Sequence, residues 1–241
     1  MRLVPVSAAL GGLLLLSGTA CVQAQRVVLR ADPPADSARA RYGPNRAVYR
    51  HLYVGYMAVV GRPAGPGAAL RYGKSGEFLV GLRHKYRLTG ALATGFDMRY
   101  ARLAYHLAQN SQKLLPTPAQ HHSESLVVSQ FQLEPYLRLS LGRRGNVIGR
   151  YLDLSGWGGW AVGTSHHYED RPGTGGGKRT VVVERDLAYV RRWSYGLGTR
   201  LGSGRYAATA HYRLSDTFTD QATPAYAELP RWLLGLEIGL F

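Results

Sequence analysis

The chain has 241 residues and carries 30 Lys and Arg against 15 Asp and Glu, which gives a net charge of +15. Its 30 glycines and 16 tyrosines favour strands and turns over helices. No stretch after residue 24 approaches the roughly 18 consecutive apolar residues of a membrane-spanning helix, so the sequence excludes a helical span.

The first 24 residues have the pattern of a secretory signal peptide. Arg2 provides the charged start, an apolar run extends from Leu3 to Leu16, and small residues at 22–24 precede the expected cleavage. The run is too short for an anchoring helix, which needs roughly 20 residues. Cleavage would also remove Cys21, which we favour over lipidation because the three residues before it lack the leucine that usually begins a lipoprotein motif. The mature chain then has no cysteine and depends on sheet closure and packing.

Residues 25–48 are rich in Pro, Ala and Arg without sustained periodicity, and they predict a flexible leader. The remaining residues, 49–241, fit one all-β domain. The basic residues of the exported chain are scattered rather than gathered in one stripe. We therefore expect phosphate-rich membrane lipids, and no nucleic acid, as the electrostatic partner.

Apolar and polar residues alternate with period two in eight segments, which predicts eight strands. The segments cover residues 49–60, 77–87, 91–109, 125–141, 151–166, 180–201, 205–218 and 231–241. In the third segment the alternation changes phase, which predicts a bulge near Ala101 and Arg102. The fourth segment is the clearest. Its apolar stripe includes Phe131, Leu133, Leu137 and Leu139, and its polar stripe includes Gln130, Gln132, Glu134 and Arg138.

The connections between the segments alternate strictly in length. Tight turns lie at 88–90, 142–146 and 202–204, and long polar or Gly/Pro-rich connections lie at 61–76, 110–123, 169–178 and 219–229. Every second connection of an up-and-down barrel returns on the same rim, so this pattern predicts such a barrel with two unlike rims.

A membrane barrel turns its apolar stripe outward, whereas a soluble lipocalin-like barrel turns it inward around a ligand. Three features favour the membrane barrel: the chain is exported, its short turns and long loops alternate, and aromatic residues lie along or near the ends of the apolar stripes, as a girdle at the membrane interface requires. These aromatic residues are Tyr86, Tyr151, Tyr206, Phe218 and Trp232. The charged stripe favours it too, because basic residues can meet acidic ones in a network inside the lumen. The basic members are Arg83, Lys85, Arg99, Arg138, Arg192 and Arg213, and the acidic members are Asp97, Glu134, Asp153, Glu184 and Glu237.

The chain resembles the small outer-membrane β-barrel proteins of Gram-negative bacteria over residues 49–241. In that family the last strand ends in an aromatic residue that the barrel-assembly machinery reads. Here Phe241 follows Leu240, Ile238 and Leu236, although it is out of phase with them. The resemblance implies a transmembrane β-barrel with short periplasmic turns and long extracellular loops, and it implies that the flexible leader of residues 25–48 is periplasmic. It also implies a location in the outer membrane, with outer-membrane lipids and lipopolysaccharide as partners and a monomeric state.

The loops contain two groups of histidines, His121-His122 and Ser165-His166-His167. Their four imidazoles could bind Zn²⁺ or Cu²⁺ if the two loops lie close together. No acidic ligand cluster accompanies them, so we favour the interpretation that they are exposed loop residues and form no metal site.

Other candidate sites are weaker. His106 and Ser111 resemble the His and Ser of small barrel enzymes that trim lipid A, but no motif surrounds them. The glycine-rich run at 173–177 lacks the ending of a phosphate loop and predicts a loop tip.

The sequence therefore predicts a non-enzymatic outer-membrane barrel without cofactors, with a structural or surface-interaction role. An eight-stranded interior is just wide enough for side chains to fill, which favours a plugged lumen. The alternatives are a small pore and a soluble barrel that binds an apolar ligand. With the apolar stripe facing lipid, Leu137→Arg is expected to impair insertion more than Gln132→Arg.

Overall fold

The computed structural model describes residues 42–142, 145–173, 175–222 and 226–240. The expected signal peptide, Cys21, the leader up to residue 41 and the terminal Phe241 lie outside the described residues. The described part includes no helix with the length and hydropathy needed to cross a membrane.

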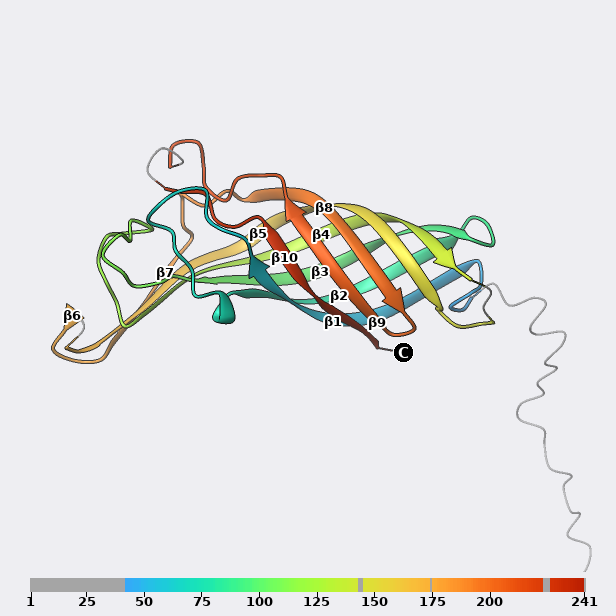
Figure 1. The fold of residues 1–241 in the computed structure, drawn as a ribbon, viewed down its shortest axis with the longest axis horizontal. Coiled ribbons are helices and arrows are strands. Elements are labelled where there is room, and N and C mark those ends of the chain that lie inside the picture. The colour runs from blue at the N-terminus through green and yellow to red at the C-terminus, as the bar shows by residue number, and fades with distance from the viewer. Residues whose placement is uncertain (1–41, 143–144, 174, 223–225, 241) are drawn as a thin grey trace, which may run out of the picture. The chain divides into compact units, whose positions relative to one another are not determined.

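Eight antiparallel strands close into a barrel (Figure 1). Each strand pairs with the next, and the last pairs with the first, from Leu52 opposite Leu240 to Val60 opposite Trp232. The prediction of a closed, all-β, antiparallel up-and-down barrel is therefore confirmed. The barrel strands are β1 (Val48–Val60), β2 (Gly76–Arg87), β3 (Leu92–His106), β4 (Ser123–Leu141), β5 (Arg150–Pro172), β8 (Trp193–Ser203), β9 (Tyr206–Arg213) and β10 (Trp232–Leu240).

Three shorter elements accompany the barrel. The strand β7 (Thr180–Arg185) pairs antiparallel with the far end of β5, and β6 (Gly175–Gly176) pairs with β5 beyond it. A single 3-10 turn, η2 (Tyr72–Lys74), lies between β1 and β2. The long connections gather at one end of the barrel and the tight turns at the other, as the alternation of lengths predicts (Figure 1).

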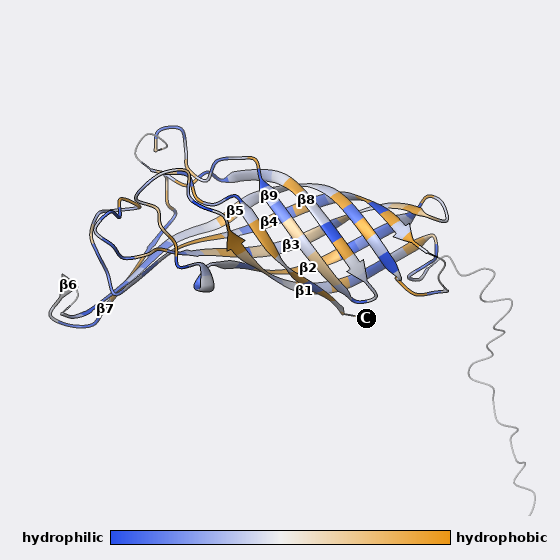
Figure 2. Ribbon diagram, in the orientation of Figure 1, coloured by the Kyte–Doolittle hydropathy of each residue, from blue (hydrophilic) through white to orange (hydrophobic). Residues whose placement is uncertain are grey.

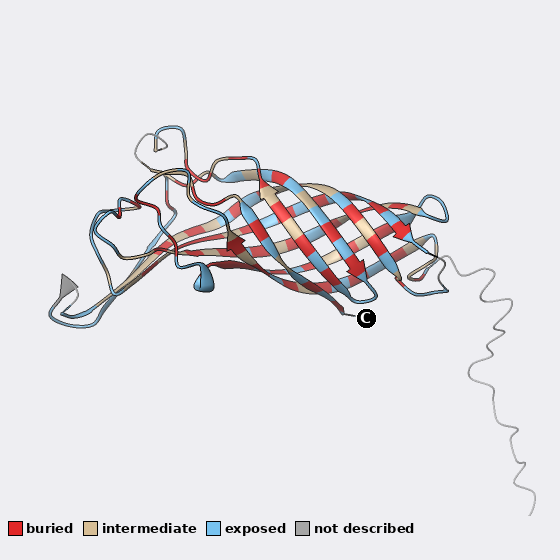
Figure 3. Cartoon of the chain, viewed as in Figure 1, coloured by how far each residue is buried: buried red, intermediate tan, exposed pale blue. Residues whose placement is uncertain are grey.

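The alternation along each strand places apolar residues outside and polar residues inside. In β4 the apolar residues Phe131, Leu133, Leu137 and Leu139 are 43% to 60% exposed, and the polar residues between them are at most 5% exposed. Figures 2 and 3 show the same stripes across the other strands. Successive side chains of a strand point to opposite faces of the sheet, so the register of a strand determines which residues face outward and which face the interior. The predicted assignment of faces in β4 is confirmed.

The predicted bulge near Ala101 and Arg102 is wrong. The strand β3 pairs with β4 from Leu92 to His106 without a shift in register. The phase change in the sequence arises because Leu103 and Tyr105 point inward, into an interior that becomes apolar toward the long loops. The irregularity lies instead between β4 and β5, where Ser129 and Gln130 pair with residues 163 and 161 and leave one residue of β5 unpaired.

The segment predicted at 180–201 is two strands, because residues 186–192 leave the sheet after Asp186, whose φ of 56° interrupts the extended backbone. Leu187, which lies in that predicted segment, is buried in the apolar cluster under the long loops. Phe218 is buried in the same cluster, and Tyr151 lies inside the barrel at the turn end. The prediction that Phe218 and Tyr151 belong to an interfacial girdle is therefore wrong.

The interior has three layers along the barrel axis. An apolar cluster that includes Met57, Leu103, Phe218 and Leu229 fills the end under the long loops. Tyr49, Ile148, Tyr151 and Ala207 form a smaller cluster at the turn end. Charged side chains occupy the middle layer, where the sequence places a polar residue at every inward position of β4 from Gln130 to Ser140.

The residues just before β1 fold against the turn end. Lys85 donates from Nζ to the carbonyl oxygen of Pro44 at 2.5 Å, and Arg87 donates from Nη1 to that of Asn45 at 2.8 Å. The described part of the predicted leader therefore contacts the barrel.

Candidate functional site

The middle layer of the barrel holds a network of four arginines and four carboxylates, so its formal charges cancel. Each of these eight side chains is at most 3% exposed, and together they come from six strands. They are Arg83 from β2, Asp97 and Arg99 from β3, Glu134 and Arg138 from β4, Asp153 from β5, Arg200 from β8 and Glu237 from β10.

Arg200 is the centre of the network. Its Nη2 atom lies 3.0 Å from Asp97 Oδ2 and 3.2 Å from Glu134 Oε1, and its Nη1 atom lies 2.9 Å from Asp153 Oδ2. Its Nε atom lies 2.8 Å from Glu237 Oε2. One guanidinium therefore contacts carboxylates from four other strands. The planar group with five N–H donors suits such a position better than a lysine, which is a point charge.

Two peripheral pairs have bidentate geometry. Arg138 donates from Nε and Nη2 to the two oxygens of Asp153, at 2.7 and 2.8 Å, and stacks over the ring of Tyr151 at 3.6 Å. Arg83 donates from Nε to Asp97 Oδ1 at 2.9 Å and from Nη2 to Oδ2 at 2.8 Å. Its Nη2 atom also reaches Glu237 at 2.7 Å. Bidentate charged pairs are among the stronger hydrogen bonds, and they fix the orientation of both partners.

The third pair connects the network to neutral groups. Arg99 forms an ion pair with Glu134 and hydrogen-bonds Gln132. Ser155 donates to Glu134 Oε1 at 2.7 Å, and His211 Nδ1 lies 3.3 Å from Arg99 Nη2. Nearly every oxygen and N–H of the layer thus faces a partner, which is what makes buried charges tolerable.

The structure brings together seven of the eleven residues that the sequence assigned to a lumenal network. The other four are elsewhere. Lys85 bonds the Pro44 carbonyl, and Arg213 pairs with Glu228 at 2.7 Å near the long loops. Arg192 and Glu184 are exposed, because they belong to the segment that leaves the sheet and to β7. Arg200 is the one member of the network outside those eleven residues, although its parity opposite the outward Leu197 and Leu201 was the signal that could have placed it inside.

The loop histidines contact separate partners. His121 Nδ1 lies 2.7 Å from Asp170 Oδ1, and His167 Nε2 lies 2.8 Å from Ser165 Oγ. The described residues include no group of three or more His, Cys, Asp or Glu side chains that could hold a metal ion.

His166 forms a clamp between strands and loops. Its Nε2 atom lies 2.8 Å from Glu124 Oε1, and its Nδ1 atom lies 3.2 Å from Glu184 Oε2. Glu124 also pairs with Lys113 of the connection between β3 and β4. Burial lowers the pKa of His166, but the hydrogen bonds to both carboxylates outweigh burial and raise it. Burial raises the pKa of Glu124, and the bonds to His166 and Lys113 outweigh it and lower that pKa.

The candidate pair His106 and Ser111 is not assembled. Ser111 is exposed in the connection after β3, whereas His106 lies in the same cross-strand row as Ser125 and His167. No hydrogen bond joins the two within the described ranges. The glycine-rich run lies in the connection between β5 and β7.

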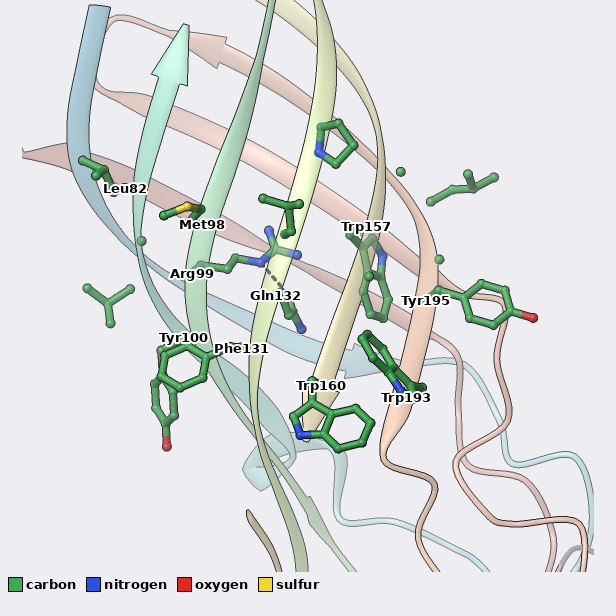
Figure 4. A pocket seen from close by; sticks show the side chains of 18 of the residues that line it. Leu82, Met98, Arg99, Tyr100, Phe131, Gln132, Trp157, Trp160, Trp193 and Tyr195 are labelled. Carbon is green, nitrogen blue, oxygen red and sulfur yellow. Dashed lines mark hydrogen bonds between the residues drawn. The ribbon is translucent and has the colours of Figure 1, made fainter. Parts of the chain in front are cut away.

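The outer wall has an apolar pocket that extends from β2 across β3, β4 and β5 to β8 (Figure 4). Gly156 and Gly158 occupy consecutive outward positions of β5, and an added Cβ would meet almost nothing within 4 Å at either one. Phe131 flanks the hollow on β4. Trp160 and Trp193 close it toward the long loops, with ring centroids 4.7 Å apart. The wall thus has an aromatic rim above a shallow apolar depression.

Comparison with known proteins identifies no relative: no protein-family model matches the chain, and no curated protein sequence matches it.

Proposed function

We propose that the chain is an outer-membrane β-barrel protein of Gram-negative bacteria with a structural or surface-interaction role and a lumen plugged by its charged layer. The observation that carries the proposal is the reversed polarity of the barrel, with leucines and aromatics outside and four ion-paired arginines inside. The proposed role is not enzymatic and needs no cofactor.

The free energy of burying apolar side chains favours contact between the outer wall and lipid. Burying one Leu, Val or Phe side chain is worth about 1.5–3 kcal/mol, and soluble monomers rarely expose contiguous apolar patches above a few hundred Å². On this barrel the apolar stripes continue from β1 to β10, with Leu52, Leu154 and Leu236 all more than half exposed. Closure between β1 and β10 also pairs the strand edges, which hydrocarbon requires.

Exposed aromatic residues lie at both ends of the apolar band. Trp160, Trp193 and Trp232 lie toward the long loops, and Tyr86 and Tyr206 lie beside the tight turns. Such girdles suit the two interfaces of a bilayer. In β4 and β5 we assign residues 131–141 and 152–160 to the membrane.

The alternatives fit the interior less well. A lipocalin-like barrel needs an apolar cavity for its ligand, whereas eight charged side chains occupy the middle of this barrel. A pore needs an open path, whereas the charged layer lies between two apolar clusters. The proposed partners are outer-membrane lipids, including lipopolysaccharide, and the barrel-assembly machinery through the last strand and Phe241. The proposed state is a monomer.

The proposal is tested on the purified mature chain. We expect β-type circular dichroism and heat-modifiable gel mobility in detergent, together with aggregation when detergent is removed. A stable monomer without detergent would refute the membrane location and favour the soluble barrel. In planar bilayers we expect no steady conductance, and large ohmic currents would favour the pore.

A further inference from the structure

The outer wall changes from apolar to basic just beyond the aromatic rim. Along β3 the outward residues run from Tyr100 to Arg102, about 7 Å further along the strand, and then to His106. Across the sheet, His106 shares a row with Ser125 of β4 and His167 of β5. The face above the proposed membrane band therefore carries an arginine, two imidazoles and a hydroxyl.

The connection after β1 adds two further cations to this face. The backbone N–H of Arg71 donates to the carbonyl oxygen of His106 at 2.8 Å. The hydroxyl of Ser75 donates to the Arg71 carbonyl at 3.0 Å and accepts from the His106 N–H at 2.9 Å. These three bonds fix η2 against β3 and place Arg71 and Lys74 beside the imidazole of His106 in one shallow pocket.

Carboxylates do not neutralise the patch. Within the described ranges, no ion pair involves Arg71, Lys74 or Arg102, and all three are exposed. Two carboxylates, Glu124 and Glu169, line the same pocket, and both have other partners. Glu124 pairs with Lys113 and His166, and Glu169 pairs with Arg171 and Arg179 at 2.8 and 2.9 Å. Arg71, Lys74 and Arg102 thus have no carboxylate partner of their own among the described residues.

The positive charge of the patch also affects the pKa values of His106 and His167. Burial lowers the pKa of His106, and Lys74, Arg71 and Arg102 lower it further. Burial also lowers the pKa of His167, with Arg102 as the next cause. Both imidazoles are therefore mainly neutral at pH 7 and lie as hydrogen-bonding groups beside permanent cations, although the Nε2 atom of His167 already lies 2.8 Å from Ser165 Oγ.

We propose that Arg71, Lys74, Arg102, His106 and His167 bind the phosphate of a phosphorylated glycolipid in the outer leaflet. The inference rests on the proposed function, because it requires the wall below the patch to lie in lipid. Guanidinium groups match phosphate oxygens bidentately, and the hydroxyls of Ser123 and Ser125 in the same pocket suit sugar hydroxyls.

A lipid fits the patch better than a free anion does. The pocket opens on the outer wall, and the apolar surface of Tyr100 and Phe131 continues directly below Arg102. A headgroup held at the patch would lay its acyl chains along these rings and the depression at Gly158. A soluble phosphate would contact only the polar part of this surface.

The experiment compares charge-matched variants of the full mature chain in nanodiscs. The probes are lipid A with both phosphates, the same lipid after enzymatic removal of its phosphates, and inorganic phosphate. Arg71→Gln/Arg102→Gln removes two charges from the patch. Arg50→Gln/Arg150→Gln removes two exposed charges near the opposite, turn end and is the control. Binding is measured by native mass spectrometry and by competition with a fluorescent lipid A.

We expect the patch variant to bind phosphorylated lipid A roughly tenfold more weakly than the wild type, and the control to bind it equally well. Removal of the phosphates should abolish the difference between the variants. Equal affinity of patch and control variants would overturn the inference, and so would equal binding of the phosphate-free lipid. Saturation by inorganic phosphate at the same concentration would assign the site to a soluble anion instead. Failure of the wild type to enter the nanodisc would refute the proposed function itself, before any variant is compared.

Discussion

Arg200 contacts all four carboxylates of the charged layer, so removal of its charge is the sharpest test of whether this layer stabilises the barrel. Arg200→Gln leaves Asp97, Glu134, Asp153 and Glu237 with only three arginines. The side chain is 1% exposed, so water does not replace the lost partner.

The expected cost follows from the burial. Breaking a buried ion pair by removal of one partner costs about 3–5 kcal/mol, because the other charge stays buried without compensation. In Arg200→Gln/Glu237→Gln the layer is neutral again, with the pairs Arg83–Asp97, Arg99–Glu134 and Arg138–Asp153 intact. We therefore expect the double variant to lose less than the sum of the two single variants, by about 1–3 kcal/mol.

The assay is equilibrium unfolding in urea in the presence of detergent micelles, followed by tryptophan fluorescence and by heat-modifiable mobility. Arg150→Gln, an exposed arginine at the start of β5, is the control and should change the free energy of unfolding by about 0.5 kcal/mol or less. The central role of Arg200 is refuted if Arg200→Gln is no more destabilising than this control. Strict additivity of the double variant would equally contradict a shared network.

Three further predictions concern the wall, the interior packing and the loops. Leu137→Arg, in the middle of the proposed membrane band, should cost about 2–4 kcal/mol on refolding into vesicles, against about 0–1 kcal/mol for Leu88→Arg in a tight turn; equal tolerance would contradict the lipid-facing assignment. Gln132→Arg is a poor control, because Gln132 is buried and bonds Arg99. Gly202→Ala should destabilise the barrel by about 1–3 kcal/mol in urea, since its Cβ would meet the Tyr151 ring at 2.1 Å, whereas Gly158→Ala has open space and should be neutral. Because the pKa of His166 is raised in the folded state, its contribution to stability is complete below about pH 6.5 and is lost as the pH rises through the folded pKa. Because the pKa of Glu124 is lowered, its contribution to stability is complete above about pH 4.3 and is lost as the pH falls through the folded pKa. Amide exchange in residues 110–121, corrected for intrinsic rates, should thus be slower near pH 5.5 than at pH 8.5, and His166→Gln should flatten this dependence; an unchanged profile would exclude the clamp.

Local periodicity predicts the barrel because each strand must divide its residues between two faces. The alternation in residues 125–141 places Leu137 outside and Arg138 inside without any knowledge of neighbouring strands. The alternation of loop lengths gives the two rims in the same way. The errors fall where a strand ends or where the interior changes in polarity, as with Phe218 and the supposed bulge at Ala101.

The sequence by itself determined which residues of most strands point inward, because a period of two is a property of each strand alone. Only the tertiary structure decided which inward charges meet. Arg200 contacts Asp97, which is 103 positions away in the chain, because closure of the sheet brings β3 and β8 across one narrow lumen. Likewise, η2 reaches His106 only because the connection after β1 folds back on β3. Such contacts depend on strand register and barrel diameter, which arise from all eight strands together and are encoded in no single segment.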